Sequence, residues 1–293
     1  MTSSVLARPT AVVRRPSPRH YLMCPPTFFD VSYAINPWMR PGPGVERELA
    51  LAQWSGLAQS YRAAGHRVDL LSPVPGLPDM VYAANGATVV DGYVLQARFA
   101  TVQRAAEAAH HGDWHAAGGR RVTMPEAVNE AEGDFAVLAD RLLAGYGFRT
   151  SPDAHAELAR LTGRPVVSLQ LVDPYFYHLD VALTVLDDAR DHVAYYPSAF
   201  SPASQAVLAE LFPDALVADA GDAACLGLNC VSDGRNVWVP AGADHLTGLL
   251  AEAGYEPHPV DLSELLRGGG SVKCCTQEIR PRRTHHPKGP APC

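Results

Sequence analysis

Two apolar segments with Asp-Gly turns constrain the fold more strongly than any other feature of this sequence. The first spans residues 80–99 and contains Asp91-Gly92, and the second spans residues 225–240 and contains Asp233-Gly234. An Asp-Gly pair between alternating apolar residues is typical of a tight β-hairpin, because both central residues of that turn need a positive φ angle. Hairpins of this kind do not suit an all-parallel sheet. The sequence therefore predicts small sheets with antiparallel strand pairs rather than one doubly wound sheet.

Helical segments alternate with these strands along the chain. Apolar periodicity predicts helices over residues 45–64, 101–118, 151–163, 202–212 and 243–254, and strands over residues 66–74, 165–172, 178–186 and 193–200. We expect Ser151 to cap the third helix and Gly163 to end it. A strand pair, a helix and a further strand recur roughly every 50 residues. Stacking several such units around an axis would bury a common core, so we predict a propeller-like α/β fold.

The domain organisation is expected to be simple. Residues 1–17 are expected to form a flexible lead-in, and residues 281–293, rich in Pro, Arg and His, are expected to form a disordered tail. No long low-complexity linker interrupts residues 18–280. A chain of 293 residues is long enough to bury a large core. We therefore predict one compact catalytic domain over residues 18–280.

Charge and composition exclude several classes of protein. The 24 Lys and Arg residues against 31 Asp and Glu residues give a net charge of -7, which leaves no basic surplus for a nucleic-acid backbone. The mean hydropathy is -0.06, and no apolar run is long enough for a transmembrane helix. No secretory signal is evident, so we expect a cytoplasmic protein whose six cysteines are free thiols. Homo-oligomer formation stays open.

The sequence also lacks several cofactor and metal motifs. It contains no GxGxxG after the first strand, no phosphate-binding GxxxxGK[ST] and no HExxH. Cys225 and Cys230 have no second nearby pair, which disfavours a structural zinc site there. We therefore expect no metal and no organic cofactor.

Residues 268–278 carry the densest chemical signal. Gly268, Gly269 and Gly270 allow a close approach of the backbone to another group, and Lys273 directly precedes Cys274. A cation beside a thiol lowers the pKa of that thiol and favours the nucleophilic thiolate. The same residues are also compatible with a glycine turn before a buried strand, in which the cysteines are small apolar core residues. On this segment alone, both interpretations stay open.

Two further segments could complete a thiol-based site. His178 lies between aromatic residues at the start of a predicted strand, and Asp180 follows two residues later, so both side chains are expected on one face. A cysteine nucleophile needs such an acid–base partner and a group that orients it. Glu132 and Asp134 flank a glycine before another strand and could supply that group. The alternatives are a core histidine and an exposed acidic turn.

Taken together and in this order, the three segments resemble the guanidino-group-modifying enzymes, the pentein or amidinotransferase superfamily. The pattern is Glu-Gly-Asp at 132–134, His-Leu-Asp at 178–180, and a glycine-rich stretch before Cys-x-Thr at 274–276. Residues 21–39 and 77–88 are similar to the two opening segments of the bacterial arginine dihydrolase branch. The resemblance covers the chain from about Arg19 to Ile279, and dimethylarginine dimethylaminohydrolase is the other close member.

The resemblance implies a five-bladed ββαβ propeller with the active site on its axis. It implies Cys274 as the nucleophile, His178 as the acid–base group and Glu132 as the group that orients His178. For substrate binding it implies contacts from Asp180 to the guanidinium, from Asn36 and Asn85 to the reacting end, and from Arg149 and Arg104 to the carboxylate, with Arg98 as the alternative to Arg104.

The activity that the resemblance implies is hydrolysis of the guanidino group of L-arginine through a covalent Cys-thiouronium. An arginine dihydrolase would attack twice, releasing ornithine, carbon dioxide and ammonia. Asn85 stands where related deiminases have an aspartate, and an amide both donates and accepts hydrogen bonds, so it would tolerate the neutral ureido group of citrulline. The alternatives are a dimethylarginine dimethylaminohydrolase, an amidinotransferase and a non-catalytic binding protein on the same fold, similar to ribosome anti-association factors.

Overall fold

The computed structural model describes residues 13–42 and 44–281. These residues form five separate three-stranded sheets of identical topology. In each sheet the central strand pairs antiparallel with one neighbour and parallel with the other, and a helix precedes the parallel neighbour. The predicted α/β propeller of five ββαβ units is therefore confirmed.

The strands are short, and four of the five sheets take their members from consecutive parts of the chain. In chain order they are β1 (His20–Met23), β2 (Arg67–Leu70), β3 (Ala87–Val90), β4 (Tyr93–Gln96), β5 (Val122–Thr123), β6 (Phe135–Val137), β7 (Leu142–Tyr146), β8 (Val166–Gln170), β9 (Leu183–Asp187), β10 (His192–Tyr195), β11 (Leu216–Val217), β12 (Val231–Ser232), β13 (Asn236–Pro240), β14 (Glu256–Val260) and β15 (Gln277–Glu278).

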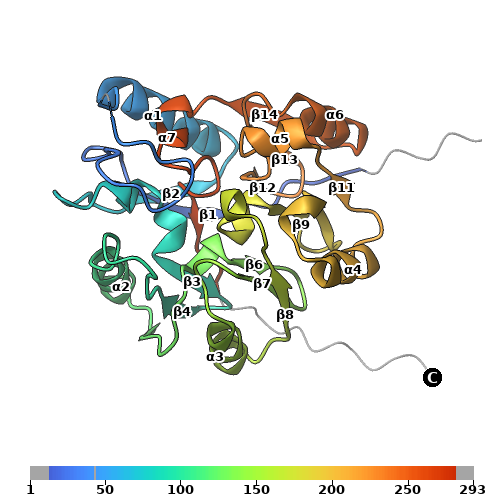
Figure 1. The fold of residues 1–293 in the computed structure, drawn as a ribbon, viewed down its shortest axis with the longest axis horizontal. Coiled ribbons are helices and arrows are strands. Elements are labelled where there is room, and N and C mark those ends of the chain that lie inside the picture. Colours follow the sequence, from blue (N-terminus) through green and yellow to red (C-terminus); the bar gives the residue numbers. More distant parts are fainter. Residues whose placement is uncertain (1–12, 43, 282–293) are drawn as a thin grey trace, which may run out of the picture.

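The helices lie around the outside of the ring of sheets (Figure 1). They are α1 (Arg47–Ala63), α2 (Glu107–Ala117), α3 (Pro152–Thr162), α4 (Pro202–Leu211), α5 (Ala220–Ala224), α6 (Asp244–Glu252) and α7 (Ser263–Leu266). Helix α1 illustrates why they pack there: Ala50, Trp54, Leu57 and Tyr61 recur at helical spacing and are all buried. Its other face is largely exposed.

The two ends of the chain close the ring. Strand β15, near the C-terminal end of the described residues, pairs antiparallel with β1, which in turn pairs parallel with β2. The last strand thus takes the position that β3, β6, β9 and β12 occupy in the other four sheets. We call these five strands the inner strands, because β15 contacts β3, β6 contacts β9 and β9 contacts β12 across the sheet boundaries.

A short turn precedes each inner strand, and these turns gather polar side chains at one end of the propeller axis. Three of them are 3-10 helices: η2 (Ala83–Asn85) before β3, η3 (Ala131–Gly133) before β6 and η5 (Leu179–Val181) before β9. Residues 226–229 precede β12, and residues 271–276 precede β15. The repeat therefore delivers residues from five distant parts of the sequence to one place.

Several local predictions were wrong. Residues 178–182 form a turn rather than the start of a strand, so the expected strand alternation of His178 and Asp180 does not apply. The helix predicted over residues 101–118 starts only at Glu107, since residues 101–106 form turns. Ser151 does occupy the N-cap position of α3, but its hydroxyl donates to the Val128 carbonyl rather than capping an amide.

The flexible lead-in was predicted to end at residue 17, but the packed domain starts before that residue. The Arg14 guanidinium lies 3.5 Å from the Tyr255 ring centroid and donates to the Ala253 carbonyl at 2.9 Å, and the Ser17 amide donates to Asp233. Residues 14–17 are therefore packed on the domain. Residues 1–12 and the tail from residue 282 lie outside the described residues.

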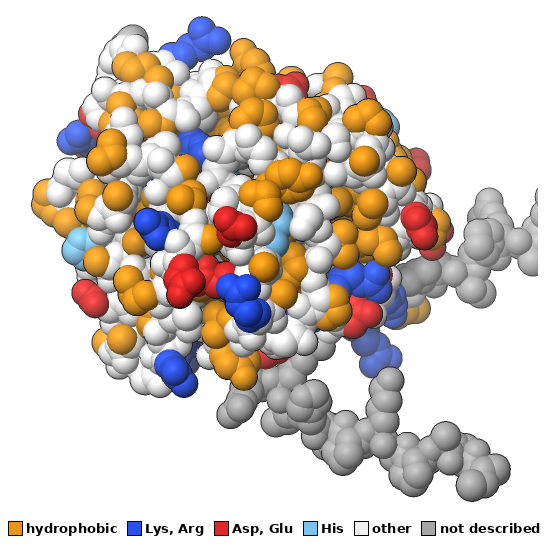
Figure 2. Space-filling model, turned by 60° about the horizontal axis from the view of Figure 1, so that its bottom comes forward, with side chains coloured by type: hydrophobic (Ala, Val, Ile, Leu, Met, Phe, Trp, Pro, Cys, Tyr) orange, Lys and Arg blue, Asp and Glu red, His pale blue; other side chains and the backbone are white. Residues whose placement is uncertain are grey.

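None of the helices within the described residues is long and apolar enough to cross a membrane. On the face shown in Figure 2, basic and acidic side chains are interspersed among neutral and hydrophobic ones, without a continuous basic area.

Candidate active site

Cys274 lies at the axial end of the propeller, where Asn229 fixes the turn that carries it. The Asn229 side-chain oxygen accepts from the Cys274 amide at 3.1 Å and from the Ser271 amide at 3.2 Å. Its side-chain nitrogen donates to the Asp180 carbonyl at 3.0 Å and lies 3.2 Å from the Cys274 sulfur. Asn229 is fully buried and joins three segments of the site, and the sequence analysis missed it.

The three glycines before Cys274 are required by close packing. A Cβ at Gly268 or Gly270 would come within 2.5 Å of the Tyr82 ring or hydroxyl, and one at Gly269 would come within 2.9 Å of the Asn36 amide. Gly269 also has a φ angle of +85°, which side chains rarely adopt. The glycine-rich stretch therefore positions the thiol against its neighbours, which fits the interpretation of a nucleophile segment.

The Cys274 thiol points at a buried carboxylate. Its sulfur donates to Asp180 Oδ2 at 3.3 Å, and both residues are almost completely buried. Burial, with the Asp180 charge next, raises the pKa of the Cys274 thiol well above its usual range. Burial also raises the pKa of Asp180 to about 7, although the positive charge of Lys273 opposes this shift. Above about pH 7, the substrate-free site therefore holds a protonated thiol beside a carboxylate.

His178 is oriented by Glu130 rather than by Glu132. The Nε2 atom of His178 lies 2.7 Å from Glu130 Oε2, and both side chains are buried. Burial opposes ionisation, but the hydrogen bond and charge of His178, together with Arg149, lower the pKa of Glu130 to about 2. An ionised Glu130 only accepts, so Nε2 carries a proton and Nδ1 is the atom free to exchange one. The predicted pairing of Glu132 with His178 is wrong.

Glu132 points toward a different set of partners. It accepts from Lys273, from Arg280 at 2.8 Å and from the Glu278 amide at 3.0 Å. Ala131, between the two glutamates, has a φ angle of +52°, a left-handed conformation that reverses the direction of the chain locally. This turn sends Glu130 and Glu132 to separate places.

Asn85 faces the same space as the free nitrogen of His178. A Cβ at Gly133 would lie 2.3 Å from Asn85 Nδ2 and 3.0 Å from His178 Nδ1, so only glycine fits between the two. The Asn85 oxygen accepts from Arg104 at 2.9 Å, and its nitrogen donates to the Glu130 carbonyl at 3.3 Å. The structure thus brings Asn85 close to His178; its predicted contact with the reacting end of the substrate stays a prediction.

Arg104, rather than Arg98, belongs to this cluster. Arg104 is buried, donates to Asn85 and forms an ion pair with Glu107 at 2.8 Å. Arg98 is exposed, and its guanidinium donates to the Glu126 carbonyl. Every nitrogen of Arg104 already donates within the protein, so part of its role is to fix the surrounding chain.

Arg149 connects the Glu130 carboxylate to the loop at residues 33–39. Its Nη1 donates to both oxygens of Glu130, at 3.1 and 2.9 Å, and its Nη2 donates to the Ile35 carbonyl at 2.6 Å. The guanidinium also lies 5.0 Å from the centroid of the Tyr177 ring. Arg149 is therefore buried beside Glu130 and His178, and its predicted contact with the substrate carboxylate stays a prediction.

The loop at residues 33–39 lies against the site through several polar contacts. The Tyr33 hydroxyl donates to Asp79 Oδ2 at 2.9 Å, and the Trp38 indole donates to the Tyr175 carbonyl at 2.8 Å. Asn36 donates to the Gly268 carbonyl at 3.1 Å, and its oxygen accepts from the amides of the following turn. Asn36 thus adjoins the nucleophile segment, but its amide already shapes the loop.

Asp79 is a buried carboxylate that sequence analysis missed. It is 1% exposed, and its Oδ1 has no hydrogen-bond partner among the described residues. Burial raises the pKa of Asp79, while Arg104 and the Tyr33 hydroxyl oppose that shift. The charges of Arg104 and Arg149 both act on this carboxyl, and its Oδ1 stays available as an acceptor.

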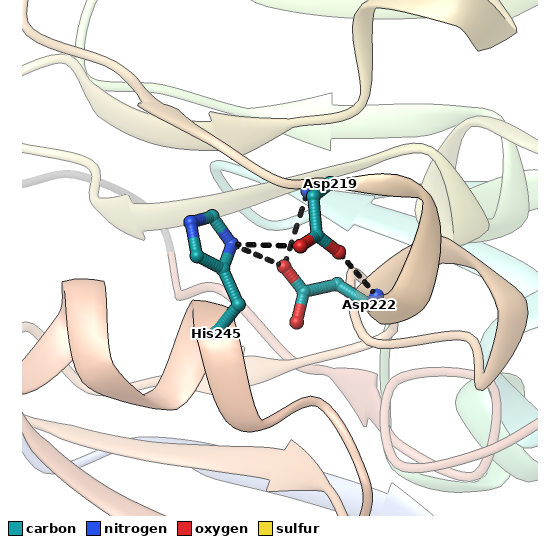
Figure 3. Close-up of side chains that lie close together, drawn as sticks. All are labelled: Asp219, Asp222 and His245. Atoms are coloured by element: carbon teal, nitrogen blue, oxygen red, sulfur yellow. Dashed lines mark hydrogen bonds and ion pairs between the residues drawn. The ribbon is translucent and has the colours of Figure 1, made fainter.

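Among the described residues, one cluster has the residue types of a metal site. Asp219, Asp222 and His245 lie close together on α5 and α6 (Figure 3). Asp219 and Asp222 form a capping box at the start of α5, and His245 Nδ1 lies 2.8 Å from Asp222 Oδ2. Capping thus accounts for this cluster, and we assign no metal to it.

The described cysteines outside the site are also free thiols, as predicted. Cys24, Cys225, Cys230 and Cys275 form no disulfide, and Cys293 lies outside the described residues. Cys275 is fully buried beside the nucleophile.

Known proteins resemble this chain over nearly its whole length. It is 53% identical, over 268 residues, to an N(G),N(G)-dimethylarginine dimethylaminohydrolase of Mycobacterium tuberculosis, an alignment that covers 92% of this chain and 88% of the relative. The chain belongs to the guanidino-modifying, or pentein, superfamily. No protein-family model matches it.

Other relatives point to the arginine dihydrolase branch of the pentein superfamily. The chain is 35% identical to the bifunctional arginine dihydrolase/ornithine cyclodeaminase AgrE of Nostoc sp., over 88% of this chain but 37% of that longer protein. The substrate-bound N-terminal domain of ArgZ, an arginine dihydrolase from cyanobacteria, superposes with a TM-score of 0.86 at 33% identity, covering 90% of this chain and 100% of that domain. The resemblance inferred from the sequence is thereby confirmed.

Proposed function

We propose that this protein hydrolyses guanidino C–N bonds of L-arginine, in the manner of an arginine dihydrolase, with Cys274 as the nucleophile. The observation that carries the proposal is the contact of the Cys274 sulfur with Asp180 at 3.3 Å. It puts a nucleophile directly beside a buried carboxylate that has a second, unpartnered oxygen. A guanidinium is a cation with several N–H donors, so it is the natural complement of such a carboxylate.

Substrate binding would activate the thiol. Without substrate, burial and Asp180 hold the pKa of Cys274 high. A guanidinium placed against Asp180 adds a positive charge beside the sulfur, which favours the thiolate over the thiol. The nucleophile thus becomes reactive only when its target is bound. Arg149 and Arg104 would hold the substrate carboxylate, and Asp79 Oδ1 would accept from its α-ammonium group.

The covalent step then follows from the positions of the two partners. The Cys274 thiolate bonds to the guanidinium carbon, the C–N bond to the terminal nitrogen breaks, and His178 delivers a proton to the departing amine. The product is a Cys-thiouronium plus ammonia. Water adds to its carbon while His178 takes up a proton, and the C–S bond breaks to return the thiol and a ureido group. Glu130 holds the imidazole for both proton transfers.

Asn85 supports a second round on the ureido product. A carboxylate at this position would repel the ureido oxygen, because both groups only accept hydrogen bonds there. An amide can instead donate a hydrogen bond to that oxygen. Citrulline would therefore remain a substrate and be converted to ornithine, carbon dioxide and a second ammonia.

The second candidate is hydrolysis of dimethylarginine to citrulline and dimethylamine. The 53% identity to a dimethylarginine dimethylaminohydrolase favours it, and the same residues would perform the chemistry. Amidino transfer to an amine shares the covalent step and is the third alternative.

The purified protein and its Cys274→Ser variant should be incubated separately with L-arginine, citrulline and asymmetric dimethylarginine, with products measured by mass spectrometry. We expect ornithine and two equivalents of ammonia from arginine, and none with the variant. Dimethylamine and citrulline from dimethylarginine alone would establish the second candidate instead.

A further inference from the structure

Arg104 and Glu107 form a buried ion pair at the start of helix α2. The Nε atom of Arg104 donates to both carboxylate oxygens of Glu107, at 3.1 and 3.2 Å, and Nη2 donates to Oε2 at 2.8 Å. Arg104 is almost completely buried, and Glu107 is fully buried. Glu107 has no part in the proposed chemistry, so a carboxylate at this depth needs another explanation, because burying a charge costs stability unless the pairing offsets it.

Glu107 fixes the direction in which the Arg104 guanidinium points. The guanidinium is planar and its N–H donors form a rigid fork, so holding two of its nitrogens on one carboxylate sets the direction of the third. Here the two are Nε and Nη2, and the third is Nη1, which donates to the Asn85 oxygen at 2.9 Å. Nη2 also donates to the Asp79 carbonyl at 3.1 Å. Glu107 therefore acts on Asn85 through Arg104.

Arg104 in turn decides which end of the Asn85 amide faces the reacting groups. A guanidinium only donates hydrogen bonds, so the Asn85 oxygen must face Arg104. The Asn85 nitrogen then points away from Arg104 and donates to the Glu130 carbonyl at 3.3 Å. A Cβ at Gly133 would lie 2.3 Å from this nitrogen and 3.0 Å from His178 Nδ1. The donor end of the amide is thus held beside the acid–base group.

An amide held in this way treats the two substrates of a dihydrolase differently. Its nitrogen carries two hydrogens, and among the described residues the bond to Glu130 uses one, which leaves the other for a substrate. The reacting end of arginine carries only N–H groups and gains nothing from a further donor. The ureido group of citrulline has an oxygen that accepts a hydrogen bond. The orientation of Asn85 therefore favours citrulline specifically.

We propose that Glu107, acting through Arg104, is a positioning residue for the second hydrolysis, because it keeps the Asn85 amide turned so that it donates to the ureido oxygen. This inference rests on the proposed function. Without Glu107 the guanidinium of Arg104 loses its fixed direction, and the Asn85 amide can rotate to present its oxygen instead. Two acceptor oxygens would then face each other in the complex with citrulline, whereas the complex with arginine would lose little.

The comparison of arginine with citrulline separates this role from a general one. Arg104 is also proposed to hold the substrate carboxylate, and both substrates carry the same carboxylate and the same α-ammonium group. A weaker grip on those groups, or a looser fold, would lower kcat/KM for both substrates by the same factor. Only the reacting end differs, so the ratio of kcat/KM for citrulline to kcat/KM for arginine reports the orientation of the Asn85 amide.

The test compares Glu107→Gln and Arg104→Lys with the wild type. Glutamine removes the charge that holds Nε and Nη2, and lysine keeps the positive charge but lacks the rigid fork. Asp187→Asn is the matched control, because it removes the carboxylate of another i,i+3 ion pair, with Arg190 at 2.9 Å. Consumption of L-arginine and of citrulline is measured separately by mass spectrometry. Burial raises the pKa of Glu107 to about 7, against the charge of Arg104, so the assays are run above that pH.

We expect the citrulline-to-arginine ratio of kcat/KM to fall by about tenfold in both variants, the usual effect of losing one hydrogen bond to the substrate. Citrulline should accumulate when these variants act on arginine, and Asp187→Asn should keep the wild-type ratio. Consumption of arginine shows that a variant is folded, and Arg104→Lys decides the outcome where Glu107→Gln does not fold.

A ratio within about twofold of the wild-type value in folded Glu107→Gln would overturn the inference, however much both rates fall. So would a lower ratio in Arg104→Lys alone, with Glu107→Gln folded, because Arg104 would then orient Asn85 without help from Glu107. A wild-type protein that consumes arginine or dimethylarginine but leaves citrulline intact would instead refute the proposed function.

Discussion

His178 donates through Nε2 to Glu130 at 2.7 Å, and this bond decides which imidazole nitrogen can do chemistry. The carboxylate of Glu130 is ionised, because the charges of His178 and Arg149 hold its pKa near 2 despite burial. The nitrogen that is free to exchange a proton is therefore Nδ1, which faces Asn85 across Gly133. Glu132, two residues away, has no part in this arrangement.

The two glutamates give a matched pair of variants. Glu130→Gln should lower kcat by about a hundredfold or more, because an amide neither stabilises the imidazolium nor fixes its tautomer. Its KM should also rise, since Arg149 loses its carboxylate partner. Glu132→Gln should keep kcat within about a factor of ten. Steady-state kinetics on arginine measure both, and a larger loss in Glu132→Gln would restore the assignment made from sequence.

The activity should depend on pH through Asp180. Burial raises the pKa of this carboxyl to about 7, so in the free enzyme it is protonated below that pH and cannot hold a cation. We therefore expect kcat/KM to rise with pH through about 7. The acid limb of kcat should lie at lower pH, because a bound guanidinium favours the ionised carboxylate.

The charge of Lys273 lowers the pKa of Asp180. Replacing Lys273 therefore tests whether Asp180 is the group that produces the acid limb of kcat/KM. In Lys273→Met, the acid limb of kcat/KM should move to higher pH. A limb that stays in place would show that another group controls it.

Asn85 should control how far the reaction proceeds. In Asn85→Asp, a carboxylate would face the ureido oxygen of citrulline, so the first hydrolysis should continue while the second stops. We expect the citrulline-to-ornithine ratio to increase by about tenfold or more when arginine is the substrate. An unchanged ratio would remove Asn85 as the determinant of the second round.

Asp79 should recognise the α-ammonium group of the substrate. Its Oδ1 is buried without a partner among the described residues, near the two arginines proposed for the carboxylate. Asp79→Asn should raise KM for arginine by about tenfold, the usual effect of losing one charge-assisted hydrogen bond. The same change should matter little for 5-guanidinopentanoate, which lacks the amino group. Equal losses on both substrates would indicate a structural role.

Parts of the fold could be predicted from the sequence because a few neighbouring residues determine the local backbone conformation. The hairpins at Asp91 and Asp233 form where Asp-Gly supplies the turn, and α3 ends at Gly163 with its φ angle of +68°. Residues 268–276 were also visible as a candidate, but their glycines and cysteines fit a buried turn equally well, and only the resemblance to the pentein superfamily singled out Cys274.

The errors arose where backbone conformation decides which way a side chain points. The positive φ angle at Ala131 separates Glu130 from Glu132, and no residue type at that position signals it, because alanine seldom adopts this conformation. The turn at residues 179–181 likewise replaced an expected strand. Asn229 acts through backbone amides far away in sequence, and its only signal was a polar residue before an apolar strand.

The measurement that tests the account most directly is peptide mapping of the enzyme quenched during turnover of L-arginine. The account predicts a thiouronium adduct on Cys274, absent from Cys275 and absent from the Cys274→Ser variant, with ornithine accumulating in the same reaction. Turnover without a modified Cys274, or an adduct on Cys275 instead, would contradict it.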